Sequence, residues 1–288
     1  MIVLFPVYSI EKQAGDHIKI SRITTQKNDA ERYNLYVVDE NSERFACGVH
    51  ESILVRWELA KDKAITAAEL EEIIQDDDVE KAKKKALHFL ARRMRTEREV
   101  RTKLEDDEVP IDHIEPVIET MKNRGFINDK EYAHTYVRTM MSTTDKGPGS
   151  MRRYLQDKGV SDAAITEALE QYDEQIQIEV ILKVIAKKDK TTSKDSLAMK
   201  KKKLTEALLR KGFQQATIAK AFEAHDFSRD ANDEWQSLHL QAEKAANKLQ
   251  RRYEPGKVKQ KLKEQLYKKG FSLAMIDEYL ETLNEERR

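Results

Sequence analysis

The sequence predicts a mainly α-helical protein, built from tandem three-helix repeats behind a small antiparallel β region at the N-terminus. Three observations lead to this prediction. Only 9 of the 288 residues are Gly and 5 are Pro, so residues that interrupt helices are scarce. Short β-branched and aromatic runs are concentrated near the start of the chain, and one apolar pattern recurs through the rest of it. We expect the repeats to stack into an elongated, curved array.

Runs rich in β-branched and aromatic residues predict three strands, at His17–Thr25, Arg32–Val38 and Arg44–Val49. The polar residues 39–42 predict a hairpin turn between the last two strands. Residues 1–10 are apolar but lack a basic leading segment, contain Pro6 and are too short to span a bilayer, so we expect a buried strand there. Apolar residues within 53–57 and 70–74 predict helices after the sheet.

An internal repeat occupies the helical part of the chain, and its three clearest copies are 151–170, 204–223 and 262–281. Each copy has Leu four residues after its first residue, Lys-Gly seven and eight residues after it, and Ile fourteen residues after it. A glycine behind a helical lysine predicts a helix end with the glycine in the left-handed conformation. A degenerate copy begins at Val100, where Glu108 replaces the glycine and leaves the turn uncertain.

These copies divide the chain into a β-rich region with connecting helices at 1–76 and four helical repeats, at 77–124, 125–173, 174–226 and 227–288. One repeat offers about a dozen buried apolar side chains, each contributing roughly 1.5–3 kcal/mol. Ordering some fifty residues costs roughly 1–2 kcal/mol per residue for the backbone alone. We therefore expect neighbouring repeats to stabilise one another by stacking.

The charges are segregated along the chain, although basic and acidic residues both number 52. The segments 81–103, 187–211 and 244–269 each hold ten basic residues against two or three acids, whereas 105–119 holds seven acids and no Lys or Arg. A single run of this kind is more often a solvated helix face. Its repetition predicts a basic stripe, which suits a periodic anionic partner such as nucleic acid or a nucleoprotein filament.

The candidate contact residues are the basic side chains of these segments and their neighbours: Arg92, Arg93, Arg95, Arg98, Lys103, Arg138, Arg152, Arg153, Lys201, Lys202, Arg210, Arg251 and Arg252. Arg is favoured in this set because its guanidinium pairs with phosphate or carboxylate through two hydrogen bonds. Four aromatic residues at helical spacing are expected in the core and not as base-stacking platforms: Phe126, Tyr132, Tyr136 and Tyr154.

Several functional classes lack support in the sequence. Cys47 is the single cysteine, which excludes an internal disulfide and a Cys-based zinc site and favours a reducing compartment. The seven histidines are never three or four residues apart, so no helical metal pair is present, and phosphate-loop and nucleophile-elbow motifs are absent. We expect a cytoplasmic, monomeric protein that is no enzyme, takes no cofactor or metal, and has no membrane segment.

Three stretches resemble the RecX family of regulatory proteins: LARRMRTEREVRTKL at 90–104, RGFINDKEYAHTYVR at 124–138 and GPGSMRRYLQDKGV at 147–160. The β-rich start and the later repeats are similar to the longer members from Gram-positive bacteria. The resemblance implies a non-enzymatic protein that binds the RecA recombinase and lies along the groove of its filament on single-stranded DNA. Repression of strand exchange, ATP hydrolysis and SOS coprotease activity would follow.

Two hypotheses result. In the first, the protein regulates RecA filaments by binding them, most simply as an inhibitor, with DNA itself as a further contact. In the second, it is a stand-alone DNA-binding helical-repeat protein or scaffold, which the basic runs alone would support.

Overall fold

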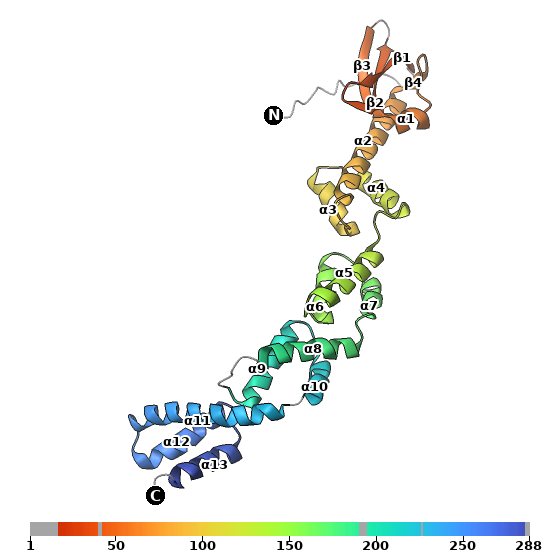
Figure 1. The fold of residues 1–288 in the computed structure, drawn as a ribbon. Coiled ribbons are helices and arrows are strands. Elements are labelled where there is room, and N and C mark those ends of the chain that lie inside the picture. Colours follow the sequence, from red (N-terminus) through yellow and green to blue (C-terminus); the bar gives the residue numbers. More distant parts are fainter. Residues whose placement is uncertain (1–16, 40–41, 190–194, 226, 286–288) are drawn as a thin grey trace. The chain divides into compact units, whose positions relative to one another are not determined.

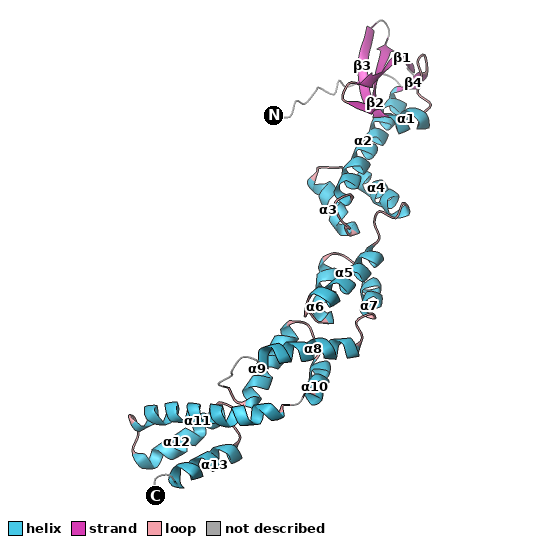
Figure 2. Ribbon diagram, viewed as in Figure 1, coloured by secondary structure: helices cyan, strands magenta, loops and turns pink. Residues whose placement is uncertain are grey.

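The computed structural model of the protein describes residues 17–39, 42–189, 195–225 and 227–285. The chain divides into two compact units, one ending at Asn128 and the other beginning at Asp129 (Figure 1). The described residues are mainly helical, with a small antiparallel sheet near the N-terminus (Figure 2). The predicted fold class is therefore confirmed in its helical repeats and its sheet. The strand predicted at residues 1–10 lies outside the described residues.

The sheet of the first unit has the strand order β3-β2-β1-β4, and its neighbours run antiparallel. Its strands are β1 (His17–Gln26), β2 (Asp29–Asp39), β3 (Ser42–His50) and β4 (Ala64–Thr66). The three predicted strands and the hairpin between β2 and β3 are confirmed. β4 was missed, because three residues are too short to show an alternating pattern. Helix α1 (Glu51–Arg56) follows β3, and its Ile53 is buried with Leu35 and Val37 of the sheet.

Helix α2 (Ala67–Leu90) belongs to both halves of the first unit. Its first turns bury Leu70 and Ile73 in the core of the sheet, and its later turns bury Ala82 and Ala86 against two further helices. These are α3 (Glu97–Asp106) and α4 (Ile111–Asn123). Reciprocal capping boxes start α2 at Thr66 and α3 at Thr96.

The second unit contains three successive groups of three helices in its described residues. The first group is α5 (Asp129–Thr143), α6 (Pro148–Asp157) and α7 (Asp162–Leu169). The second is α8 (Glu174–Asp189), α9 (Leu197–Arg210) and α10 (Gln215–Ala224). The third is α11 (Ser228–Gln250), α12 (Pro255–Lys268) and α13 (Leu273–Glu285). The first two groups share one hydrophobic core, and the third has a core of its own. The predicted three-helix repeat is confirmed.

The turn between the second and third helices has the same backbone in every group. Gly159, Gly212 and Gly270 have φ angles of 83°, 91° and 89°. Glu108 occupies the corresponding place in the first unit with φ 58°, so the degenerate copy keeps the left-handed turn without a glycine. A side chain in that conformation costs roughly 1–2 kcal/mol, which the packing around Leu104 and Val109 offsets.

The prediction that four aromatic residues lie in the core is confirmed in part. Tyr132 is buried, and the partly buried rings of Tyr136 and Tyr154 stack with centroids 4.4 Å apart. Burial raises the pKa of Tyr136 to about 12. Phe126 was wrongly predicted as a core residue. It is 49% exposed, because it directly follows Gly125 (φ 73°) in the turn after α4 and points away from the helix packing.

Candidate partner-binding surfaces

A recurring contact ties the second helix of a group to its third helix. A basic side chain reaches an acceptor fourteen residues later. Arg101 donates to Glu115 at 2.9 Å, and Lys263 donates to Asp277 at 2.6 Å. Arg152 takes the corresponding place and donates to the Thr166 hydroxyl at 3.2 Å. Some basic residues of the second helix therefore pair with acceptors on the third helix of the same repeat. This pairing accounts for part of the alternation between basic and acidic helices.

The candidate arginines of the first unit differ in accessibility. Arg92 is exposed, with no side-chain partner among the described residues, and Arg93 is exposed and 3.5 Å from Glu99. Arg95 is only 14% exposed: its guanidinium lies 4.1 Å above the Phe89 ring and 3.7 Å from Glu99. Its role is thus to pack the turn between α2 and α3, and it offers little surface to a partner.

The remaining candidates of the first unit lie on α3. Arg98 is exposed at the start of the helix. Lys103 pairs with Asp107 at 2.5 Å and holds the pKa of that carboxyl below its usual range. Its charge is therefore balanced inside the unit. The exposed candidates of this region are Arg92, Arg93 and Arg98.

The second unit presents a larger set of exposed cations. The exposed candidates without a side-chain partner among the described residues are Arg138, Lys202, Arg210, Arg251 and Arg252. Arg153 is also exposed and donates only to the Gly149 carbonyl of its own helix, at 3.4 Å. Lys201 instead places its ammonium 4.3 Å above the Phe227 ring. Arg152 and Lys201, two of the predicted contact residues in this unit, therefore use their side chains for contacts within the fold.

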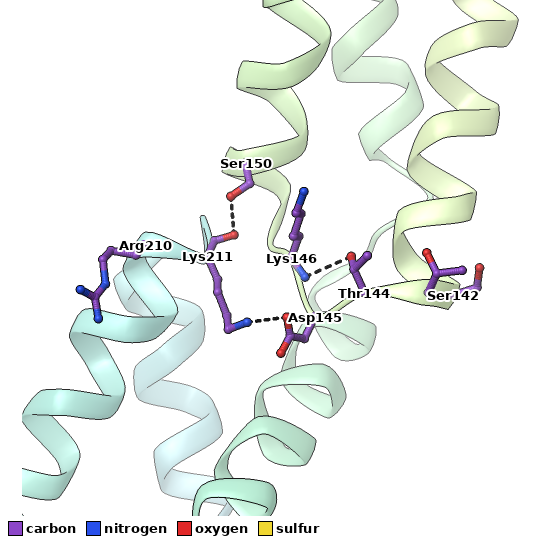
Figure 3. Close-up of a pocket in the computed structure, with 8 residues that line it drawn as sticks. Ser142, Thr144, Asp145, Lys146, Ser150, Arg210 and Lys211 are labelled. Atoms are coloured by element: carbon purple, nitrogen blue, oxygen red, sulfur yellow. Dashed lines mark hydrogen bonds and ion pairs between the residues drawn. The ribbon is translucent and has the colours of Figure 1, made fainter. Parts of the chain in front are cut away.

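The N-terminus of α6 docks on the C-terminal end of α9. The amides of Gly147 and Gly149 donate to the carbonyls of Lys211 and Gly212, at 2.7 and 2.9 Å. The Ser150 hydroxyl donates to the Lys211 carbonyl at 2.6 Å (Figure 3). Donors that a helix start leaves unpaired thus meet acceptors that a helix end leaves unpaired, and the two dipoles align favourably. These α6 amides are consequently not available to an anion.

The next junction of the unit repeats the arrangement between α9 and α12. The Ser196 hydroxyl donates to the Lys269 carbonyl at 2.8 Å, and the Leu197 amide donates to Glu234 at 2.8 Å. Gly270 leaves no space for a side chain here, because an added Cβ would lie 2.7 Å from the Ser196 hydroxyl. The repeated Lys-Gly turn therefore also forms the contact surface between successive repeats.

An open hollow of about 680 Å³ lies beside the junction of α6 and α9 (Figure 3). Hydroxyl groups at the end of α5, from Ser142 to Thr144, line one part of it. Lys146, Arg210 and Lys211 line the rest, and the ammonium of Lys211 pairs with Asp145. Three cations against one carboxylate give a surface suited to phosphate oxygens, whereas the hydroxyls of Ser142, Thr143 and Thr144 already donate to carbonyls of α5. The sequence carries only a weak signal for this hollow, since Arg210 is the one lining residue that belongs to the predicted contact residues.

The metal-ligating side chains of the described residues are dispersed. These residues contain no group of three or more His, Cys, Asp or Glu side chains that could hold a metal ion. Cys47 is half-buried in β3, and burial raises its pKa to about 11, which makes it a poor nucleophile. None of the described helices is long and apolar enough to cross a membrane.

Family models match almost all of the described chain. The model of the RecX N-terminal domain matches residues 18–66, and the model of the first RecX three-helix domain matches 82–121. The second three-helix model matches 128–169, and the third matches twice, at 175–222 and 232–280. The sheet and all four groups of helices are therefore similar to domains of this one family.

Individual proteins that are similar to this chain are also named regulatory protein RecX. A regulatory protein RecX from Oceanobacillus iheyensis is 35% identical over 91% of this chain and 97% of its own length. One from Bacillus mycoides is 36% identical over 93% and 98%. A crystal structure of a regulatory protein RecX is similar over 72% of this chain and 99% of its own, with 31% identity and a TM-score of 0.65.

Proposed function

The chain belongs to the RecX family of regulatory proteins, and we propose from this membership that it binds the RecA recombinase and the filament that RecA forms on single-stranded DNA. Binding would restrain the ATPase, strand-exchange and SOS coprotease activities of the filament. We further propose that the protein acts in the cytoplasm as a monomer, by binding alone, without catalysis, cofactor or metal.

The observation that supports this proposal best is that RecX models cover the sheet and every group of helices. The exposed cations add physical support. Arg153 and Arg210 lie in successive groups of one unit, on α6 and α9, whose ends meet at a hydrogen-bonded junction. Cations repeated in this way suit a partner with regularly spaced phosphates or carboxylates.

The test is a titration of RecA ATPase activity on single-stranded DNA with the full-length protein. We expect the ATPase rate to fall as the protein approaches the number of filament sites. An unchanged rate at several-fold excess, together with no co-sedimentation with filaments, would reject the proposal. An increased ATPase rate together with co-sedimentation would support RecA as the partner, but it would mean that the protein stimulates the ATPase activity instead of lowering it.

Charge reversal locates the contact surface. We expect Arg92→Glu with Arg93→Glu, and Arg153→Glu with Arg210→Glu, to weaken filament binding while the circular dichroism of the helices stays unchanged. Arg152 is not a suitable target, because its side chain bridges to Thr166 and lies near Asp162. Lys61→Glu is the matched control, since Lys61 is exposed and lies outside the basic segments.

The second candidate is direct DNA binding as a stand-alone helical-repeat protein or scaffold, which the cation-lined hollow beside Asp145 favours. Binding to labelled DNA without RecA should then weaken with salt, with a log–log slope of roughly −0.7 per neutralised phosphate of a single strand. Negligible affinity for naked DNA, combined with persistent filament binding, would reject this candidate in favour of the first.

A further inference from the structure

A second hollow, of about 720 Å³, lies in the first unit between the sheet and the later turns of α2. Its sheet wall includes Arg32 and His50, which face each other in the β2–β3 register. These two residues alternate with Tyr33 and Val49, which contact the core. Since successive side chains of a strand point to opposite faces, the hollow lies on the face of the sheet turned away from its core.

The helical wall of this hollow carries a basic stripe. Lys81, Lys84, Lys85 and His88 line it at spacings of three, four and seven residues, so they share one face of α2. At 1.5 Å per residue the stripe is about 10 Å long, which exceeds the axial rise per phosphate of one duplex strand, about 3.4 Å. It can therefore meet more than one phosphate.

Most of the cations that line the hollow pair with carboxylates. Its four Lys and Arg side chains are Arg32, Lys81, Lys84 and Lys85, and Arg32 pairs with the buried Asp77 at 2.7 Å. Lys84 pairs with Asp29 at 2.9 Å, and Lys81 pairs with Asp77 and Asp78 of its own helix. Lys85 forms no ion pair among the described residues and donates to the Asp107 carbonyl at 3.2 Å, so its ammonium is the one available to an anionic ligand.

An exposed aromatic ring borders the same hollow. Phe45 of β3 is 55% exposed, and its ring meets Tyr36 edge to face with centroids 5.8 Å apart. Arg22 covers the Tyr36 ring at 4.1 Å, so this neighbour is itself held in place. The Gln26 side chain lies against Gly48 in the floor of the hollow, where an added Cβ would be only 2.5 Å from Gln26 Nε2. Phe45 thus offers a fixed, accessible flat face beside a row of cations.

We propose that this hollow binds single-stranded nucleic acid, with a base stacked on Phe45 and the neighbouring phosphates on the lysines of α2. Stacking on an exposed aromatic ring combined with a basic track is the arrangement that recognises single strands without sequence preference. An acidic peptide would use the lysines but has no need of Phe45. The proposal concerns the first unit alone and does not depend on binding to RecA.

The experiment measures binding of a fluorescently labelled oligothymidylate to the full-length protein, with no RecA present. Phe45→Ala should lower the affinity roughly 5- to 100-fold, the usual effect of losing one stacked base. Lys84→Gln with Lys85→Gln should reduce the log–log salt slope by about 1.4, or about 0.7 per lost phosphate contact. Lys61→Gln, in the same unit but outside the hollow, should leave both values unchanged.

Phe45→Trp keeps a flat ring and adds a direct readout. Its extra fluorescence, relative to the parent protein, should be quenched by the oligonucleotide, and thymidine monophosphate should quench it only at far higher concentration. The proposal is overturned if the oligonucleotide does not bind to the parent protein. It is equally overturned if the Phe45→Ala and lysine variants bind the oligonucleotide with the affinity and salt dependence of the parent protein. It is also overturned if polyglutamate competes as well as the oligonucleotide, which would identify an acidic protein segment as the ligand.

Discussion

Replacement of Gly212 by alanine would test whether the Lys-Gly turn joins successive repeats as well as ending a helix. Gly212 has φ 91°, and an added Cβ would lie 2.3 Å from the Ser150 amide nitrogen and 2.7 Å from its hydroxyl. The Ser150 amide is backbone and cannot move aside by a change of rotamer. The junction between α6 and α9 must therefore open, in addition to the cost of the left-handed conformation.

The expected magnitude follows from these two effects. The left-handed backbone costs an alanine roughly 1–2 kcal/mol. Opening the junction strains or breaks the three hydrogen bonds from Gly147, Gly149 and Ser150, each contributing roughly 0.5–1.5 kcal/mol net. We expect Gly212→Ala to destabilise the second unit by about 2.5–6.5 kcal/mol, within the range of severe single substitutions.

Substitutions at two other glycines separate the conformational cost of a left-handed alanine from the cost of opening the junction. Gly125 has φ 73° with nothing within 4 Å of an added Cβ, so Gly125→Ala should cost only the conformational part, roughly 1–2 kcal/mol. Gly256 lies in the first turn of α12, also with open space around it and without a positive φ. Gly256→Ala should stabilise the helix by roughly 0.5–1 kcal/mol.

The assay is urea denaturation followed by circular dichroism, with amide hydrogen exchange to localise the change. Exchange is needed because a chain with two units need not unfold in one step. The Gly147 and Gly149 amides should be protected in the parent protein and should lose protection in Gly212→Ala. If Gly212→Ala costs no more than Gly125→Ala and both amides stay protected, the junction does not carry the stability assigned to it.

Three further predictions concern the first unit. Arg32→Ala should cost about 3–5 kcal/mol in thermal denaturation, because the Asp77 carboxylate is 1% exposed and would lose its bidentate partner; an equally stable variant would contradict this. Hydrogen bonds from the Thr66 backbone and hydroxyl lower the pKa of Glu69 in the folded protein. The stability that Glu69 contributes is therefore present above its unfolded pKa, near 4.5, and is lost as the pH falls through its folded pKa. Glu69→Gln should flatten the stability profile in that acidic range, and an unchanged acid limb would argue against the capping box. Burial raises the pKa of Cys47 to about 11, so iodoacetamide at pH 8 should label the native thiol much more slowly than the unfolded one, as read by mass spectrometry.

The candidate contact residues illustrate what sequence spacing can and cannot predict. Their basic character and clustering are visible in the sequence, and Arg153 and Arg210 are exposed in the structure as expected. Arg95 carries the same sequence signal, yet it is folded onto Phe89 and Glu99. Whether an arginine serves a partner or its own fold depends on which groups lie next to it in space, and spacing along the chain does not report that.

The sequence by itself determined the repeat, the helix ends and the three longer strands. These features depend on interactions between residues close in the chain, such as the capping box at Thr96 or the turn at Gly270, and local interactions leave regular spacings. Only the tertiary structure decided the bridge from Arg101 to Glu115, the docking of α6 on α9, and the hollow beside Phe45. Each of these joins residues from separate elements, and such contacts arise from packing, which imposes no fixed interval on the sequence.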